Sequence, residues 1–171
     1  MTFRVIFSAA AAGLLLGASA VRADTVVFAR SGPWEAFGGT AANGTAVCGM
    51  STSWPDDRYF GVKYFKGDNT VVIQLGSPHW RIEDGAKQRV IMQIDRRGPW
   101  GANATGMHFS ATEAGLGFSI SRNQLDTFIA EFRYGDVLGF AFPNTTADNW
   151  SVSLRGTNAV TSSFANCIEA M

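Results

Sequence analysis

The feature that most restricts the fold is a series of short segments rich in β-branched and aromatic residues, which extends over most of the chain. Glycine, proline, asparagine and aspartate separate these segments, as a series of turns would. Short connections between consecutive strands favour antiparallel pairing. The expected strands are 25–29, 34–37, 45–52, 59–65, 70–75, 89–94, 107–111, 116–120, 137–142 and 150–154.

Two segments of the C-terminal third have helical periodicity instead. Apolar residues recur at i, i+3, i+4 and i+7 from Leu125 onward, and Ser121 with Gln124 forms a capping-box pattern before them. A second helix is expected over 157–170. The sequence therefore predicts a β-rich α+β domain, an antiparallel sheet or sandwich of about 8–10 short strands with two helices in the C-terminal third.

Residues 1–23 have the features of a secretory signal peptide, namely a basic residue near the start, a short apolar run and small residues before Asp24. Cleavage is expected after Ala20 or Ala23, and we prefer Ala23 because a polar residue then begins the mature chain. The alternative is a membrane anchor, which needs roughly 20 consecutive apolar residues. We therefore predict export to the periplasm or out of the cell.

The two cysteines, Cys48 and Cys167, both fall in the predicted mature chain. In an oxidising compartment such a pair is most simply a disulfide, and two free buried thiols are the alternative. Their spacing and number exclude a Cys-x-x-Cys redox pair and a cysteine metal site. Residues 24–171 are thus predicted to form a single disulfide-closed globular domain.

Charge restricts the class of partner. The full chain has 14 basic and 14 acidic residues, and removal of the predicted signal peptide leaves 12 basic residues and a net charge of −2. A slightly acidic domain without a basic cluster is not expected to bind nucleic acid or an anionic membrane surface. No later segment is long and apolar enough for a membrane span.

Sequence motifs for catalysis are missing. The chain has no G-x-S-x-G, S-x-x-K or H-E-x-x-H pattern and no phosphate-binding glycine loop, so neither a cofactor nor a metal is expected. His79 and His108 are its two histidines, interpreted as a loop residue and a strand residue. The alternative is a small envelope hydrolase that uses His79 or His108 with Asp95.

Tryptophans provide the main candidate for a binding surface. Trp54, Trp80 and Trp100 each stand beside a proline near a predicted turn, where aromatic side chains with a polar rim can hold a sugar, a peptide or a lipid head group. Arg96 and Arg97 add two cations near Trp100. Core packing of the rings and a solvated hairpin tip are the alternatives. We expect a protein, small-molecule or glycan partner on this surface.

The C-terminal part of the chain has a familiar order of elements. Helix residue Phe128, Gly135, the segment 150–156 and a Phe-x-x-Cys pattern ending at Cys167, together with the early Trp34, resemble the invasion-associated locus B-like family of small exported proteobacterial proteins. The resemblance implies a non-enzymatic function in the cell envelope at the interface with a host cell, without catalytic residues. An exported binding protein is therefore our leading hypothesis, with the hydrolase and an accessory or inhibitor protein of a secretion system as alternatives.

Overall fold

The computed structural model describes residues 24–109 and 113–171, so the predicted signal peptide lies outside the described residues. Ten strands of the described part form one antiparallel sheet in the order β1-β2-β3-β4-β5-β8-β7-β6-β9-β10. The elements are β1 (Asp24–Ser31), β2 (Trp34–Thr40), β3 (Ala46–Ser53), β4 (Tyr59–Phe65), β5 (Thr70–Ser77), β6 (Lys87–Ile94), β7 (Trp100–His108), β8 (Ala114–Ser121), η1 (Arg122–Gln124), α1 (Leu125–Tyr134), β9 (Val137–Ala141), β10 (Trp150–Ser153) and α2 (Thr157–Glu169).

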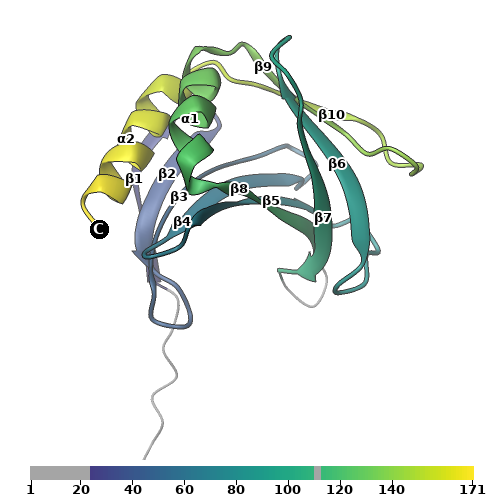
Figure 1. Ribbon diagram of the computed structural model, residues 1–171, viewed down its shortest axis with the longest axis horizontal. Helices are drawn as coiled ribbons and strands as arrows, with labels where there is room; N and C mark the ends of the chain where they lie inside the picture. Colours follow the sequence, from purple (N-terminus) through teal and green to yellow (C-terminus); the bar gives the residue numbers. More distant parts are fainter. Residues whose placement is uncertain (1–23, 110–112) are drawn as a thin grey trace, which may run out of the picture.

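The sheet curls strongly, and the two helices lie side by side within its curve near β1, β2 and β3 (Figure 1). Large apolar side chains of both helices pack against the concave face, where Trp34, Phe60, Phe128, Phe132 and Phe164 are fully buried. Burial of this size dominates folding because each large apolar side chain contributes about 1.5–3 kcal/mol. The predicted β-rich α+β class is confirmed, in its single-sheet form.

The helix prediction is confirmed at its capping residues. The Ser121 backbone N–H donates to Gln124 Oε1 at 3.3 Å, although the first turn after Ser121 is the 3₁₀ turn η1 and α1 begins only at Leu125. Gly135 caps the C-terminal end of α1, as its position predicts. Ser121 and Gly135 therefore bound the helical segment where the sequence predicts its ends.

Strand β7 differs from the expectation for 107–111, because it begins at Trp100 and ends at His108. Its sequence is rich in glycine, alanine and asparagine, which have low β propensity. Backbone pairing with β6 along most of its length places these residues in the sheet. Residues 110–112 lie outside the described residues.

The two edges of the sheet are protected in different ways. At β10, the carbonyl oxygens of Ser153 and Ser151 accept hydrogen bonds of 3.0 Å from the indole N–H groups of Trp34 and Trp54. At β1, the register shifts between Val27 and Ala29, as in a β-bulge. Both features oppose pairing of a free edge with another strand. The indole bonds also connect β10 to β2 and to the residue after β3.

The predicted disulfide is present between Cys48 in β3 and Cys167 in α2, with a Cα–Cα distance of 6.0 Å across a sequence separation of 119 residues. Gly38 pairs with Cys48 in the neighbouring strand, and a Cβ at Gly38 would lie 3.0 Å from the Cys167 sulfur. Glycine at this position therefore leaves room for the bridge. The disulfide fastens the last helix to the concave face of the sheet.

Candidate functional site

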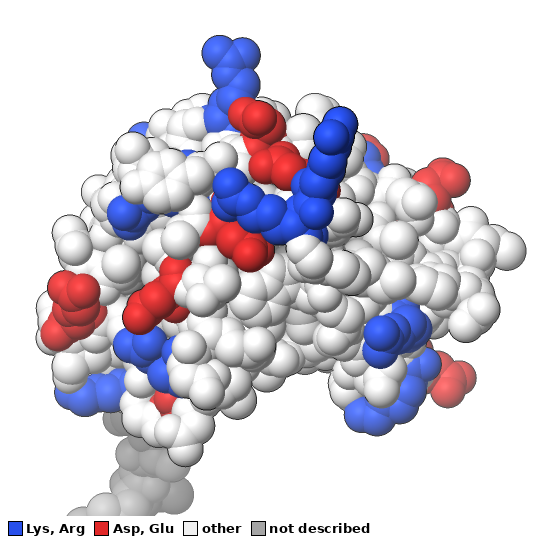
Figure 2. Space-filling model, turned by 45° about the horizontal axis from the view of Figure 1, so that its top comes forward, with Lys and Arg blue, Asp and Glu red and all other residues white. Residues whose placement is uncertain are grey.

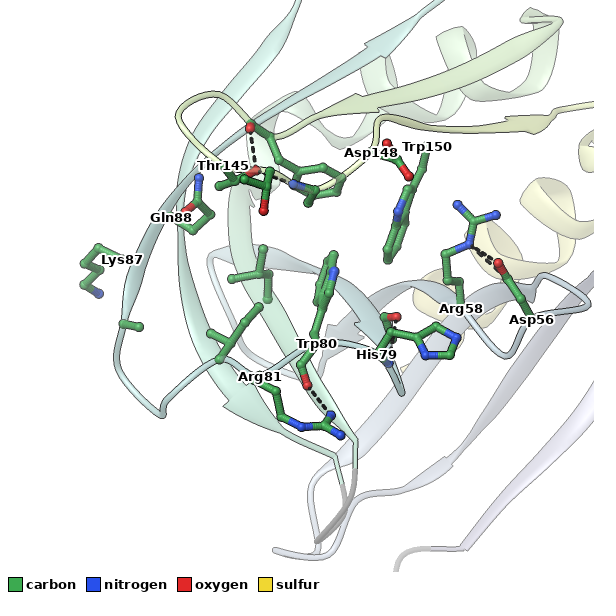
Figure 3. Close-up of a pocket in the computed structure, with 17 residues that line it drawn as sticks. Asp56, Arg58, His79, Trp80, Arg81, Lys87, Gln88, Thr145, Asp148 and Trp150 are labelled. Carbon is green, nitrogen blue, oxygen red and sulfur yellow. Dashed lines mark hydrogen bonds and ion pairs between the residues drawn. The ribbon is translucent and has the colours of Figure 1, made fainter.

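A cavity of about 670 Å³ lies on the concave side of the sheet, away from the helices (Figure 3). Its walls come largely from the connection after β3, the 78–86 loop between β5 and β6, and the 142–149 loop between β9 and β10. These segments meet because β5 pairs with β8 and β6 pairs with β9, which are not neighbours in the chain. The volume is that of a typical small-molecule pocket.

Three aromatic side chains line the cavity, those of Trp80, Phe142 and Trp150. The indoles of Trp80 and Trp150 are stacked, with centroids 4.7 Å apart and an interplanar angle of 18°. Phe142 meets both rings edge-on, at 5.5 Å from Trp80 and 5.4 Å from Trp150. Trp54 lies against Trp150 at 5.7 Å. Two of the three tryptophans proposed from the sequence thus belong to one cluster, hereafter the Trp80 cluster (Trp54, Trp80, Phe142 and Trp150).

A cation covers part of this cluster. The guanidinium of Arg58 lies 5.2 Å from the centroid of Trp150 and 5.3 Å from that of Trp54, in cation–π geometry. Arg58 Nε also pairs with a carboxylate oxygen of Asp56 at 2.9 Å. The hydrogen bond from Arg58 lowers the pKa of Asp56, so this carboxyl is ionised at neutral pH and is neutralised by its partner.

Polar side chains surround the opening of the cavity (Figure 3). Arg81 Nη1 donates to two backbone carbonyls of its own loop, at 2.9 and 3.1 Å. The Lys87 ammonium points away from the cavity and donates to the Thr105 hydroxyl at 2.7 Å on the other face of the sheet. Gln88 Nε2 donates to the carbonyl of Pro143 at 3.0 Å, which fastens β6 to the 142–149 loop. Asp148 is exposed on that loop. The rim therefore carries charges of both signs.

The 78–86 loop is held against β7. Gly85 N–H donates to the Gly106 carbonyl at 3.0 Å, and Gly106 N–H donates to the Ala86 carbonyl at 2.8 Å. A Cβ at Gly106 would collide with the backbone carbonyl oxygen of Glu83. This close approach of two backbones requires glycine and holds the loop that carries Trp80. The cavity is therefore largely preformed.

The other proposed surface residues lie elsewhere. Trp100 packs edge-on against Phe128 of α1 at 5.8 Å, and its indole N–H donates to Glu131 Oε2 at 2.9 Å. Arg96 and Arg97 are exposed in the turn between β6 and β7. The turn lies at the end of β6 away from Lys87, and therefore away from the cavity. The structure thus separates these three residues from the Trp80 cluster.

The two histidines and Asp95 also lie apart. His79 lines the cavity, whereas His108 Nδ1 pairs with Asp84 Oδ1 at 2.7 Å on the surface. Asp95 accepts hydrogen bonds of 2.9–3.2 Å from backbone N–H groups at the start of β9. His108 and Asp95 are at opposite ends of the β6–β7 pair, which separates them by roughly 35 Å along the strands at about 3.3 Å per residue.

Sequence reasoning did not single out Phe142, Trp150 or Arg58. Both aromatic residues belong to predicted strands, where aromatic residues are common for structural reasons alone. The polar turn at 144–149 directly before Trp150 is the one local signal that could have selected it, because it matches the turn positions of the other tryptophans.

Charged side chains on the face shown in Figure 2 occur in small groups of both signs, without a large area of one sign. Within residues 24–109 and 113–171, no three His, Cys, Asp or Glu side chains gather as metal ligands. In the same part of the chain, none of the helices has the length and apolarity needed to cross a bilayer.

No protein-family model matches the chain, and no curated protein matches it. Among solved structures, the fold is similar to that in the crystal structure of invasion associated protein B from Bartonella henselae, with a TM-score of 0.52 and 20% sequence identity. The similarity covers 85% of this chain and 96% of that chain. At this identity the likeness concerns the fold, and at that level it supports the resemblance found in the sequence.

Proposed function

We propose that this is an exported cell-envelope protein that binds a ligand through the cavity at the Trp80 cluster and does not transform it. The observation that carries the proposal is the cavity itself, in which stacked indoles are enclosed by loops that hydrogen bonds hold in place. Pockets with an aromatic lining and a few directed polar groups are typical of ligand sites. The signal-like N-terminus and the disulfide support an oxidising location.

We also propose that the protein acts at the contact with a host cell. This proposal draws on the fold shared with a protein whose name associates it with invasion. The sequence resemblance to exported proteobacterial proteins points in the same direction.

Binding without catalysis accounts better for the cavity than hydrolysis does. A hydrolase places a nucleophile, a base and an orienting group within hydrogen-bond reach of one another. In the described residues the His79 ring has no hydrogen-bonded carboxylate, while His108 and its partner Asp84 do not line the cavity. Asp95 is occupied by the backbone of β9.

The binding proposal is tested by thermal unfolding of the protein with and without the small-molecule fraction of the native host's envelope. A ligand at 100 times its Kd stabilises by about 2.7 kcal/mol, which raises the Tm by roughly 5–10 °C. We expect this shift in the wild type and in the control variant Trp100→Phe, and its loss in Trp80→Ala. A shift of equal size in Trp80→Ala would exclude the cavity as the binding site.

Catalysis and export have separate readouts. Mass spectrometry of the bound fraction should recover the ligand unchanged, and conversion of the ligand by the wild type but not by His79→Ala would replace binding with enzymatic activity.

Export is tested by the intact mass of the protein from its native host, which should match residues 24–171 less two hydrogens. An uncleaved chain with two alkylatable thiols would contradict export.

A further inference from the structure

The cavity also restricts the chemistry of its ligand. On the basis of the proposed function, we infer that it takes an uncharged compound with a flat apolar ring system and few hydrogen-bonding groups. Three properties of the lining support this class, namely the apolar surface beside Trp80, the polar groups that already have partners, and the balance of charge.

The apolar surface that is open to a ligand belongs mainly to Trp80. Trp150 is 5% exposed and lies between Trp80 on one face and Arg58 on the other, so a ligand cannot stack on it. Trp80 is half-buried, and in Figure 3 Trp150 stands on one side of it while Gln88 stands on the other. Half-buried Ile82 adds aliphatic surface to the lining. This surface suits a flat ring in offset stacking or edge-on contact.

The cavity offers few polar groups to a ligand. The Gln88 amide nitrogen already donates to two backbone carbonyls, and the Thr145 hydroxyl bonds twice to the backbone of its own loop. Ser77 Oγ accepts a backbone N–H. In the described part of the chain, the buried side-chain atoms without a hydrogen bond are Thr52 Oγ1 and Gln74 Oε1, and neither residue lines the cavity. A sugar needs replacements for its hydrogen bonds to water, and this lining supplies few.

The charges that face the cavity balance one another. Apart from one histidine, they are the ion pair of Asp56 with Arg58, at 2.9 Å, and the exposed side chains of Arg81 and Asp148, which have opposite signs. The Lys87 ammonium is on the other face of the sheet. A charged ligand would lose hydration on entry and meet no excess of opposite charge in return. The lining therefore favours a neutral molecule.

Three naphthalene derivatives that differ in one substituent test this inference. At pH 7, 1-naphthalenemethanol is neutral, 1-naphthoate is an anion and 1-naphthylmethylammonium is a cation. Each is titrated against the full chain to displace the neutral fluorescent probe N-phenylnaphthylamine. We expect the alcohol to displace the probe at a concentration about tenfold or more below that of either ion, because the ions lose hydration without gaining a partner. Methyl glucoside should not displace the probe.

Variants that disturb the charge balance should change the affinity for the ions. Asp148→Asn leaves Arg81 without an opposing charge and should tighten naphthoate binding about threefold. Arg81→Gln should tighten binding of the ammonium by a similar factor, while the affinity for the alcohol stays within about twofold in both variants. Lys66→Gln, in a turn outside the cavity lining, is the matched control and should change none of the three affinities.

Two further variants separate failure of this inference from failure of the proposed function. Trp80→Ala removes the stacking surface, and Ala86→Trp adds a ring to the cavity from an exposed position, so each should weaken binding of the fluorescent probe about tenfold or more. An ion that binds as tightly as the alcohol, with both lost in these variants, would overturn the selection of an uncharged ligand while the cavity remained a ligand site. Failure of the wild type to bind the probe, with the ligand-dependent rise in Tm still present, would exclude the ring class alone. Probe binding that neither variant weakens would overturn the proposed function as well.

Discussion

The contact between β10 and β2, hereafter the seam, provides a test of how the curled sheet is stabilised. Trp34 is fully buried, its indole N–H donates to Ser153 O at 3.0 Å, and its ring packs edge-on against Phe60 and Phe132. Trp34→Phe keeps an aromatic ring at this position and removes both the hydrogen-bond donor and part of the ring volume. We expect this substitution to destabilise the fold.

The expected cost has two parts. Loss of an intramolecular hydrogen bond costs about 1 kcal/mol. The smaller ring leaves a cavity among side chains that cannot fully relax, and this adds about 1–2 kcal/mol, well below the 3–5 kcal/mol of a full truncation to alanine. The total is about 2–3 kcal/mol. Trp54→Phe removes an equivalent indole bond to Ser151, but from a more exposed site, and should cost about 1 kcal/mol or less.

Urea unfolding followed by far-ultraviolet circular dichroism measures both variants without depending on tryptophan fluorescence. With a slope of about 2 kcal/mol/M, Trp34→Phe should lower the unfolding midpoint by roughly 1–1.5 M at unchanged slope. If Trp34→Phe proves no more destabilising than Trp54→Phe, the buried indole does not hold the seam in the way that its geometry indicates.

Three further predictions concern other parts of the molecule. Replacement of both Cys48 and Cys167 by alanine should lower the free energy of unfolding in urea by up to about 5 kcal/mol, because the variant loses the closure of a long loop. A reductant should then no longer change the stability of the variant. Burial raises the pKa of Tyr59 from 10.0 to about 12. The neutral phenol therefore stabilises the fold fully below pH 10.0, and this contribution is lost as the pH rises toward 12. Between these pH values the free energy of unfolding should fall less in Tyr59→Phe than in the wild type. Gly106→Ala should displace the loop that crosses it and reduce the ligand-dependent rise in Tm, whereas Gly98→Ala, which has open space around it, should not.

The strands and helices were largely predictable because they depend on local chemistry. The strand at Tyr59–Phe65 matches its prediction, since alternating large apolar residues bounded by turns favour a strand locally. Strand β7 did not follow this rule. Its Gly106 is required because the neighbouring loop approaches the backbone there, which is a tertiary requirement that no local pattern records.

The candidate site was only partly predictable, because the order of strands in the sheet determines it. Trp54 and Trp80 were correctly placed at turns, but their meeting with Trp150 depends on β5 pairing with β8 and β6 with β9. The same order places Trp100 beside α1. The position of a tryptophan beside a proline or an arginine in the sequence does not show whether it joins the Trp80 cluster or packs against α1.

Trp150 connects the two parts of the concave face of the sheet, the packed core and the cavity. Near β1 to β3, the helices and the disulfide fill the face and supply the stabilising contacts, while the rim of the cavity is made of loops, whose side chains can change at little cost to the fold. Trp150 contacts Trp80 in the cavity and also Trp54, whose indole holds Ser151 at the seam. A ligand that orders Trp80 therefore acts on the same aromatic cluster that closes the sheet. Because of this connection, binding at the cavity should stabilise the whole domain and not only its loops.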